Sequence, residues 1–220
     1  MARTDTRKPH TVLLDFDGVL NIPRFSYDVE HRAFRGGTTP TDQDELAWLR
    51  KDAPDDLERV TLQGLIDLPV YGVVRRSVIN ELKAFAREFD ARLFWATSWL
   101  TYPERLHEAA TLIGLDFVQM PDMEGITPFN EPLYNVRGHW KTELAHLHVH
   151  RGHRVLWIDD QLEPRPARQE LQFLSIIAPN TLYGLNLAHL DAMRAWADGS
   201  DVGVFDNQSH LGWGRSSASF

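Results

Sequence analysis

Two aspartates separated by a single residue are the strongest chemical signal in this sequence. Asp15 and Asp17 close an apolar run at residues 12–16, and Gly18 follows them directly. Side chains alternate along a strand, so both carboxylates are expected on the same side. Neighbouring carboxylates repel each other, and a protein that keeps both needs a proton or a cation between them. A solvated strand end or an Asx turn is the plainer alternative.

A second acidic pair, Asp159 and Asp160, ends another apolar run at residues 155–158. A simple turn after a strand would also account for this pair. Together with Asp15 and Asp17, however, it makes an oxygen-rich set of ligands without sulfur or histidine. Hard divalent cations prefer such ligands. We therefore expect Mg²⁺ to bind at these four aspartates.

Short apolar runs alternate with helical patterns along most of the chain. Most of the runs are continuously apolar, as is typical of parallel strands buried on both faces. The expected strands are 12–16, 92–96, 115–120, 155–158 and 173–177, and the expected helices are 76–89, 103–113, 140–149 and 187–197. This alternation predicts an α/β fold, a Rossmann-like parallel sheet in three layers with helices on both faces. Ligands of such sheets bind at the carboxyl ends of the strands, where the aspartates lie.

One long stretch interrupts the alternation. Residues 21–74 separate the first strand from the next helix, and a simple crossover needs far fewer residues. We interpret them as an inserted cap or flap over the strand ends, with a helix near 42–51 and with Arg24 as a candidate substrate contact. An insertion packed away from the site is the alternative. The predicted core then comprises 1–20 and 75–198, and residues 199–220 form a flexible tail.

Composition excludes several classes of protein. The chain has 220 residues and no cysteine, so disulfides, thiolate zinc sites and cysteine nucleophiles are excluded. Its 31 acidic and 23 basic residues give a net charge of −8, which argues against a broadly basic surface that coats nucleic acid but allows a local basic pocket. No apolar run is long enough for a bilayer or a signal peptide, so we expect a cytoplasmic protein without membrane partners.

The segment Leu14-Asp-Phe-Asp-Gly-Val-Leu20 resembles the first motif of the haloacid dehalogenase (HAD) superfamily in its phosphatase form. That superfamily places a Thr or Ser after a second apolar strand, then a Lys or Arg, and then an acidic pair at the end of a later strand. This chain offers Thr97-Ser98, Lys141 and Asp159-Asp160 in that order. The resemblance covers residues 11–20 and 76–197, but neither the insertion nor the tail.

The resemblance implies a Mg²⁺-dependent phosphatase. Asp15 would attack phosphorus and form an aspartyl-phosphate, and Asp17 would serve as general acid and base. The backbone carbonyl of Asp17 would also bind the metal. The second aspartate distinguishes the phosphatase branch, because the dehalogenase members lack it.

The resemblance also assigns the phosphate contacts. Thr97 would donate to a phosphoryl oxygen, with Ser98 as the competing candidate. The sequence from Thr101 to Glu104 resembles a capping box, which would leave Thr97 or Ser98 free for this role. Lys141 would neutralise charge on the phosphate, and Arg137 is the substitute candidate.

Four histidines near the end of one expected helix invite a metal hypothesis. His146 and His150 would share a helix face, and such a pair can bind zinc. No acidic or sulfur ligand has convincing spacing, and histidine is favourable near a helix C-terminus for its own reasons. We therefore favour a structural role for these residues.

A phosphorylated small molecule is the favoured substrate class. The alternatives are a nucleotide or nucleic-acid end-processing phosphatase and a non-catalytic binding protein that keeps the fold. The identity of the substrate and the oligomeric state stay open, because the cap and loops of this superfamily select the substrate while the core supplies the chemistry.

Overall fold

A computed structural model describes residues 9–23, 57–63, 69–124, 126, 139–160, 174–179, 184–200 and 202–206. The elements in chain order are β1 (His10–Leu14), β2 (Ile22–Pro23), β3 (Leu57–Gln63), β4 (Pro69–Arg75), α3 (Arg76–Glu88), β5 (Arg92–Trp95), η1 (Ser98–Thr101), α4 (Pro103–Ile113), α5 (His139–His150), β6 (Arg154–Ile158), β7 (Leu174–Ala178), α6 (Leu187–Ala197) and β8 (Val204–Asp206). The expected helix near 42–51 lies outside the described residues. Within them, no helix is both long and apolar enough to cross a membrane.

A parallel five-stranded sheet forms the centre of the fold. Its strand order is β5-β1-β6-β7-β8, and every neighbouring pair is parallel. β1 therefore has the next parallel strand in the chain, β5, on one side and β6 on the other. Such a reversal of strand order opens a crevice at the carboxyl ends of the central strands, where α/β proteins bind ligands. The expected Rossmann-like α/β fold is confirmed.

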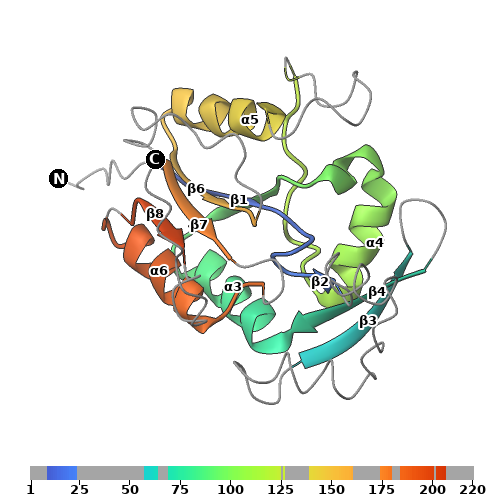
Figure 1. The fold of residues 1–220 in the computed structure, drawn as a ribbon. Helices are drawn as coiled ribbons and strands as arrows, with labels where there is room; N and C mark the ends of the chain where they lie inside the picture. Colours follow the sequence, from blue (N-terminus) through green and yellow to red (C-terminus); the bar gives the residue numbers. More distant parts are fainter. Residues whose placement is uncertain are drawn as a thin grey trace, which may run out of the picture.

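The two faces of this sheet carry separate cores. Val12 and Leu14 of β1 pack in one apolar cluster with residues of α3, α4 and α6. Leu13 points the other way and packs in a second cluster with Trp140 and Leu144 of α5. Figure 1 shows the same layers, with α5 on one face of the sheet and α3 and α6 on the other. The alternation of side chains along β1 thus decides which face each residue serves.

A second, smaller sheet lies within residues 22–75. Its order is β2-β4-β3, and both pairings are antiparallel. Ile22 of β2 and Val73 of β4 form its buried apolar contact, and α3 begins directly after β4. The hairpin of β3 and β4 extends beside α3 and α4 in Figure 1. The expectation that this segment closes over the strand ends stays a prediction.

Three sequence expectations need correction. Residues 115–120 do not form a strand, because the chain turns at 116–118 and only Gln119 bridges to Phe94 of β5. Residues 204–206, which were assigned to the tail, instead add β8 to the parallel sheet. Thr101 does not cap α4, since Tyr102 is its N-cap residue and the Thr101 hydroxyl donates to the carbonyl of Ser98 at 2.7 Å.

Candidate active site

Pairing of β1 with β6 brings the two acidic motifs together. Leu14 lies opposite Ile158, so the residues that follow them, Asp15 and Asp159, leave the sheet side by side. Asp15 lies two residues after Leu13, and Asp159 lies two residues after Trp157, so each is expected on the same face as the earlier residue. Both of the earlier side chains pack on the α5 face. The two carboxylates are therefore expected toward α5, whereas Phe16 is buried in the opposite core.

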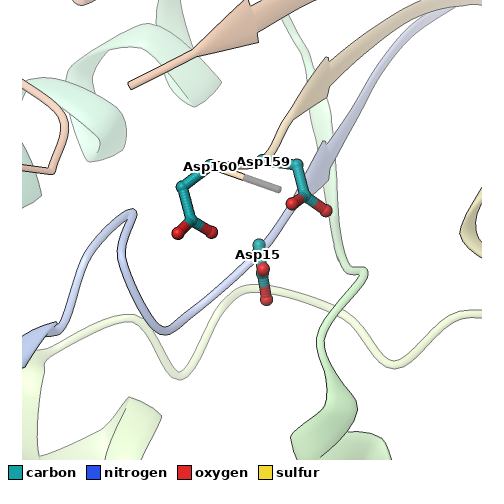
Figure 2. Close-up of side chains that lie close together, drawn as sticks. All are labelled: Asp15, Asp159 and Asp160. Carbon is teal, nitrogen blue, oxygen red and sulfur yellow. The ribbon is translucent and has the colours of Figure 1, made fainter. Parts of the chain in front are cut away.

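Three carboxylates converge at this edge of the sheet. One oxygen from each of Asp15, Asp159 and Asp160 lies within 4.8 Å of the others, and Figure 2 shows the three side chains around a shared space. Asp15 and Asp159 are buried and Asp160 is half-buried. Gly18 makes room for the third, since a Cβ at this position would lie 2.3 Å from Asp160 Oδ2. Its φ of +72° is also one that glycine adopts without strain.

Lys141 reaches this cluster from the first turn of α5. Its Nζ donates to Asp15 Oδ2 at 2.9 Å and to Asp159 Oδ2 at 2.6 Å. Burial alone would lower the pKa of the ammonium group, but attraction by these two carboxylates outweighs burial and raises the pKa. Lys141 therefore stays charged at neutral pH. One lysine leaves the cluster of three carboxylates with an excess of negative charge.

Further donors orient the two buried carboxylates. The backbone N–H of Phe16 donates to Asp15 Oδ1 at 2.8 Å. The indole N–H of Trp157 donates to Asp159 Oδ2 at 3.2 Å. Asp15 thus has one oxygen held by the backbone and the other by Lys141, which restricts its rotation.

Asp17 lies in a different setting from Asp15. The chain turns after Phe16, and the Asp17 carboxylate accepts from Asn21 Nδ2 and from Trp99 Nε1, both at 2.7 Å. The residue as a whole is exposed, and partial burial of its carboxylate raises the pKa. The two hydrogen bonds act in the opposite direction, because they favour the charged form.

The hydroxyl candidates also differ from each other. Thr97 is fully buried just after β5, and its Oγ1 accepts from the backbone N–H of Trp99 at 3.4 Å. Because the hydroxyl accepts in this contact, its hydrogen remains free to donate. Ser98 begins η1 and is exposed. Arg24 and Arg137 lie outside the described residues.

The donor set fits a hard divalent cation. Asp15, Asp159 and Asp160 offer carboxylate oxygens, the ligands that Mg²⁺ prefers. Because Gly18 has no Cβ, the Asp160 carboxylate can lie close to the other two carboxylates. The Asp17 carboxylate lies outside this group of three, so its side chain does not complete the ligand set that we expected. A part for its backbone carbonyl stays a prediction.

A parallel sheet with acidic residues after two neighbouring central strands and a lysine from the covering helix is the architecture of HAD superfamily domains. The family model described as "HAD domain in Swiss Army Knife RNA repair proteins" matches residues 11–190. Because this match covers most of the chain, the chain belongs to that family. No curated protein and no solved structure shows a significant match to it.

Sequence reasoning did not find the partners of Asp17. Asn21 follows Asp17 by four residues within the turn after β1, and a polar residue in a turn gives no signal for this contact. Trp99 lies in η1, and the residues around it in the sequence give no sign of a contact with Asp17. The hydrogen bond joins residues 82 positions apart, so no local pattern in the sequence marks it.

Proposed function

We propose that this protein is a Mg²⁺-dependent phosphomonoester hydrolase that acts through an aspartyl-phosphate on Asp15. The observation that carries the proposal is the position of Asp15, which lies beside two further carboxylates and is held by the Lys141 ammonium group. A nucleophilic carboxylate needs nearby positive charge because it must approach a phosphate that is itself negative. Membership of the family supports the same chemistry.

The first half-reaction transfers the phosphoryl group to the protein. An Asp15 carboxylate oxygen attacks phosphorus in line, a new P–O bond forms, and the ester P–O bond breaks. Asp17 gives its proton to the departing alcohol oxygen. The raised pKa of Asp17 supports this role, because a larger share of the carboxyl group is protonated near neutral pH.

The second half-reaction restores the enzyme. A water molecule attacks phosphorus, Asp17 takes a proton from it, and the bond from phosphorus to Asp15 breaks with release of inorganic phosphate. Lys141 offsets charge on the nucleophile, and the Thr97 hydroxyl donates to the phosphoryl group. Mg²⁺ bound by Asp15, Asp159 and Asp160 would offset the remaining negative charge of the phosphate and the nucleophile.

Hydrolysis of 4-nitrophenyl phosphate tests this proposal. The wild-type protein is expected to be active with Mg²⁺ and inactive with excess EDTA, and Asp15→Asn should lower kcat by roughly 10³-fold or more. Asp116→Asn is the matched control, because Asp116 is an exposed aspartate in the turn after α4. Circular dichroism checks that both variants are folded. Full turnover by Asp15→Asn, or turnover unaffected by EDTA, would refute the mechanism.

A phosphorylated RNA end is a second candidate substrate. The family description names RNA repair proteins, and this is the observation that favours it. An RNA substrate is expected to raise kcat/KM above that of the matching mononucleotide, because contacts to neighbouring nucleotides add binding energy. The comparison uses oligoribonucleotides with a 3′- or 5′-phosphate against nucleoside monophosphates. Equal values would favour a small-molecule substrate, for which we propose residues 21–74 as the selecting flap.

A further inference from the structure

The Asp17 carboxylate accepts hydrogen bonds from two neutral donors in different parts of the chain. Asn21 Nδ2 donates to Oδ1 and Trp99 Nε1 donates to Oδ2, each at 2.7 Å. Each carboxylate oxygen has two lone pairs, so each oxygen keeps one that neither donor occupies. The arrangement can therefore hold the side chain in place and still allow a proton to bind.

Both donors are themselves rigidly placed. Trp99 is 2% exposed, and its ring packs edge-on against Phe16 with the centroids 5.0 Å apart. Asn21 is 1% exposed. The backbone of β4 lies directly against the Asn21 side chain, because a Cβ at Gly72 would lie only 1.7 Å from Asn21 Oδ1. Neither donor can follow Asp17 if the aspartate rotates away.

Asp17 needs this support more than Asp15 does. Asp15 is buried and has Lys141 and a backbone N–H as partners, whereas Asp17 is exposed. An exposed aspartate without fixed partners samples several rotamers. A proton donor that is misplaced by about 1 Å loses roughly 10²-fold in rate.

We infer that Trp99 and Asn21 are positioning residues, which hold the Asp17 carboxylate in the one orientation that serves the leaving oxygen. This inference rests on the proposed phosphatase function and deepens it. The two residues touch neither the phosphate nor the nucleophile in this assignment. They act only through the placement of Asp17.

The dependence of rate on the leaving group separates this role from a merely structural one. Nitrophenolate leaves phosphorus readily without a proton, whereas the alkoxide from benzyl phosphate requires one. Loss of a positioned acid should therefore reduce kcat/KM for benzyl phosphate much more than kcat/KM for 4-nitrophenyl phosphate. General damage to the site would lower both values alike.

The variants are Trp99→Phe, which keeps an aromatic ring but removes the N–H, and Asn21→Leu, which keeps the size but removes the amide. Each is expected to raise the ratio of kcat/KM for 4-nitrophenyl phosphate over benzyl phosphate by roughly 10-fold or more. Trp95→Phe is the matched control. Trp95 is equally buried and also packs on Phe16, with centroids 5.9 Å apart, but within the described part of the chain it is not a hydrogen-bond donor to Asp17. Its ratio should equal the wild-type ratio.

The outcomes distinguish this inference from the proposed function. If the wild-type protein hydrolyses both esters and Asp15→Asn hydrolyses neither, the phosphatase proposal stands. Wild-type ratios in both Trp99→Phe and Asn21→Leu would then overturn the positioning role alone. Thermal unfolding shows whether each variant is folded, and if one is not, the other decides. A ratio raised equally in Trp95→Phe would also overturn the inference, because it would indicate a packing effect.

Discussion

Asp15 and Asp17 are two residues apart but have different chemical surroundings. Asp15 is paired with the Lys141 ammonium group, and Asp17 is bound by the neutral donors of Asn21 and Trp99. A cation beside a carboxylate offsets the negative charge that the nucleophile brings to a phosphate. A carboxylate that is desolvated among neutral groups has a raised pKa and suits a proton donor. The difference in surroundings supports the division of roles that we propose.

Lys141 should affect catalysis and cation binding in opposite directions. Lys141→Met leaves three clustered carboxylates without their compensating charge. Turnover should fall by roughly 10²-fold or more, because the phosphoryl group loses a cation at the site. The affinity for Mg²⁺ should nevertheless rise by about tenfold or more, since a positive charge no longer repels the metal.

Kinetics with 4-nitrophenyl phosphate measure the loss of turnover, and calorimetric titration with MgCl₂ measures the affinity. Lys83→Met is the control, because Lys83 lies on α3, which packs against the opposite face of the sheet. Weaker Mg²⁺ binding by Lys141→Met would contradict the assignment of Asp15 and Asp159 as metal ligands.

At the scale of elements, the parallel core could be predicted and the flap could not. From Val12 in β1 and from Val155 in β6, the strand residues are buried and continuously apolar, and an aspartate follows each strand directly. β3 and β4 are antiparallel strands outside the main sheet, and neither is a continuous apolar run. Residues 115–120 were expected to form a strand and do not. Leu115 and Val118 are apolar because they pack in the core, and not because they belong to a paired strand.

The candidate site also has a part that the sequence predicted and a part that it did not. Asp15, Asp159 and Lys141 could be placed from the sequence because each follows or begins a regular element, and the sheet then brings them together. The contacts of Asp17 depend on the shape of a turn and on a tryptophan from η1. No periodic pattern encodes either feature.

Gly72 should influence Asp17 although it belongs to a different sheet. Gly72→Ala would push the Asn21 side chain away, because the new Cβ would lie 1.7 Å from its Oδ1. If Asn21 acts as a positioning residue, this variant should shift the preference between the two phosphate esters in the same direction as Asn21→Leu.

A double-mutant cycle tests whether the effect passes through Asn21. In an Asn21→Ala background, the extra methyl of Gly72→Ala has no amide to displace, so the second change should add little to the first. Additive effects on the ratio of kcat/KM would show that Gly72 acts by another route.

At the scale of the whole molecule, the acidic cluster and a cluster of histidines lie at opposite ends of the parallel strands. His153 lies near the start of β1, where its Nδ1 is 2.9 Å from Thr11 Oγ1, whereas the carboxylates follow the other end of that strand. His148 contacts His153, with 3.1 Å between their Nδ1 atoms, and its ring packs on Phe94. These contacts give His148 and His153 partners within the fold, and the structural role that we favoured for the histidines stays a prediction.

His148 should make stability depend on pH. Burial, together with repulsion from His153 and Arg151, lowers its pKa from 6.5 to about 4, and Asp122 opposes this shift only weakly. The unfolded chain therefore binds a proton at a higher pH than the folded chain does. The free energy of unfolding should fall as the pH decreases from 6.5 to about 4, and this contribution should be fully lost below that range.

Urea unfolding at a series of pH values measures this dependence. His148→Phe should reduce the slope between pH 6.5 and 4, because phenylalanine cannot take up a proton and can still pack on Phe94. His150→Gln, at an exposed position on the same helix, should keep the wild-type slope. An unchanged slope in His148→Phe would assign the acid sensitivity to other groups.

The register of the small sheet has a consequence for how specificity could be changed. Pro23 of β2 and Val60 of β3 both lie opposite Gly72 of β4, so the chain departs and returns on either side of one strand. Two strand spacings separate these positions by roughly 10 Å. A foreign segment long enough to span this distance could join them, and Asn21 lies outside the part that would be exchanged. The base of the insertion is thus a natural graft point, at which new segments could be exchanged while the proposed acid–base group, Asp17, stays in place.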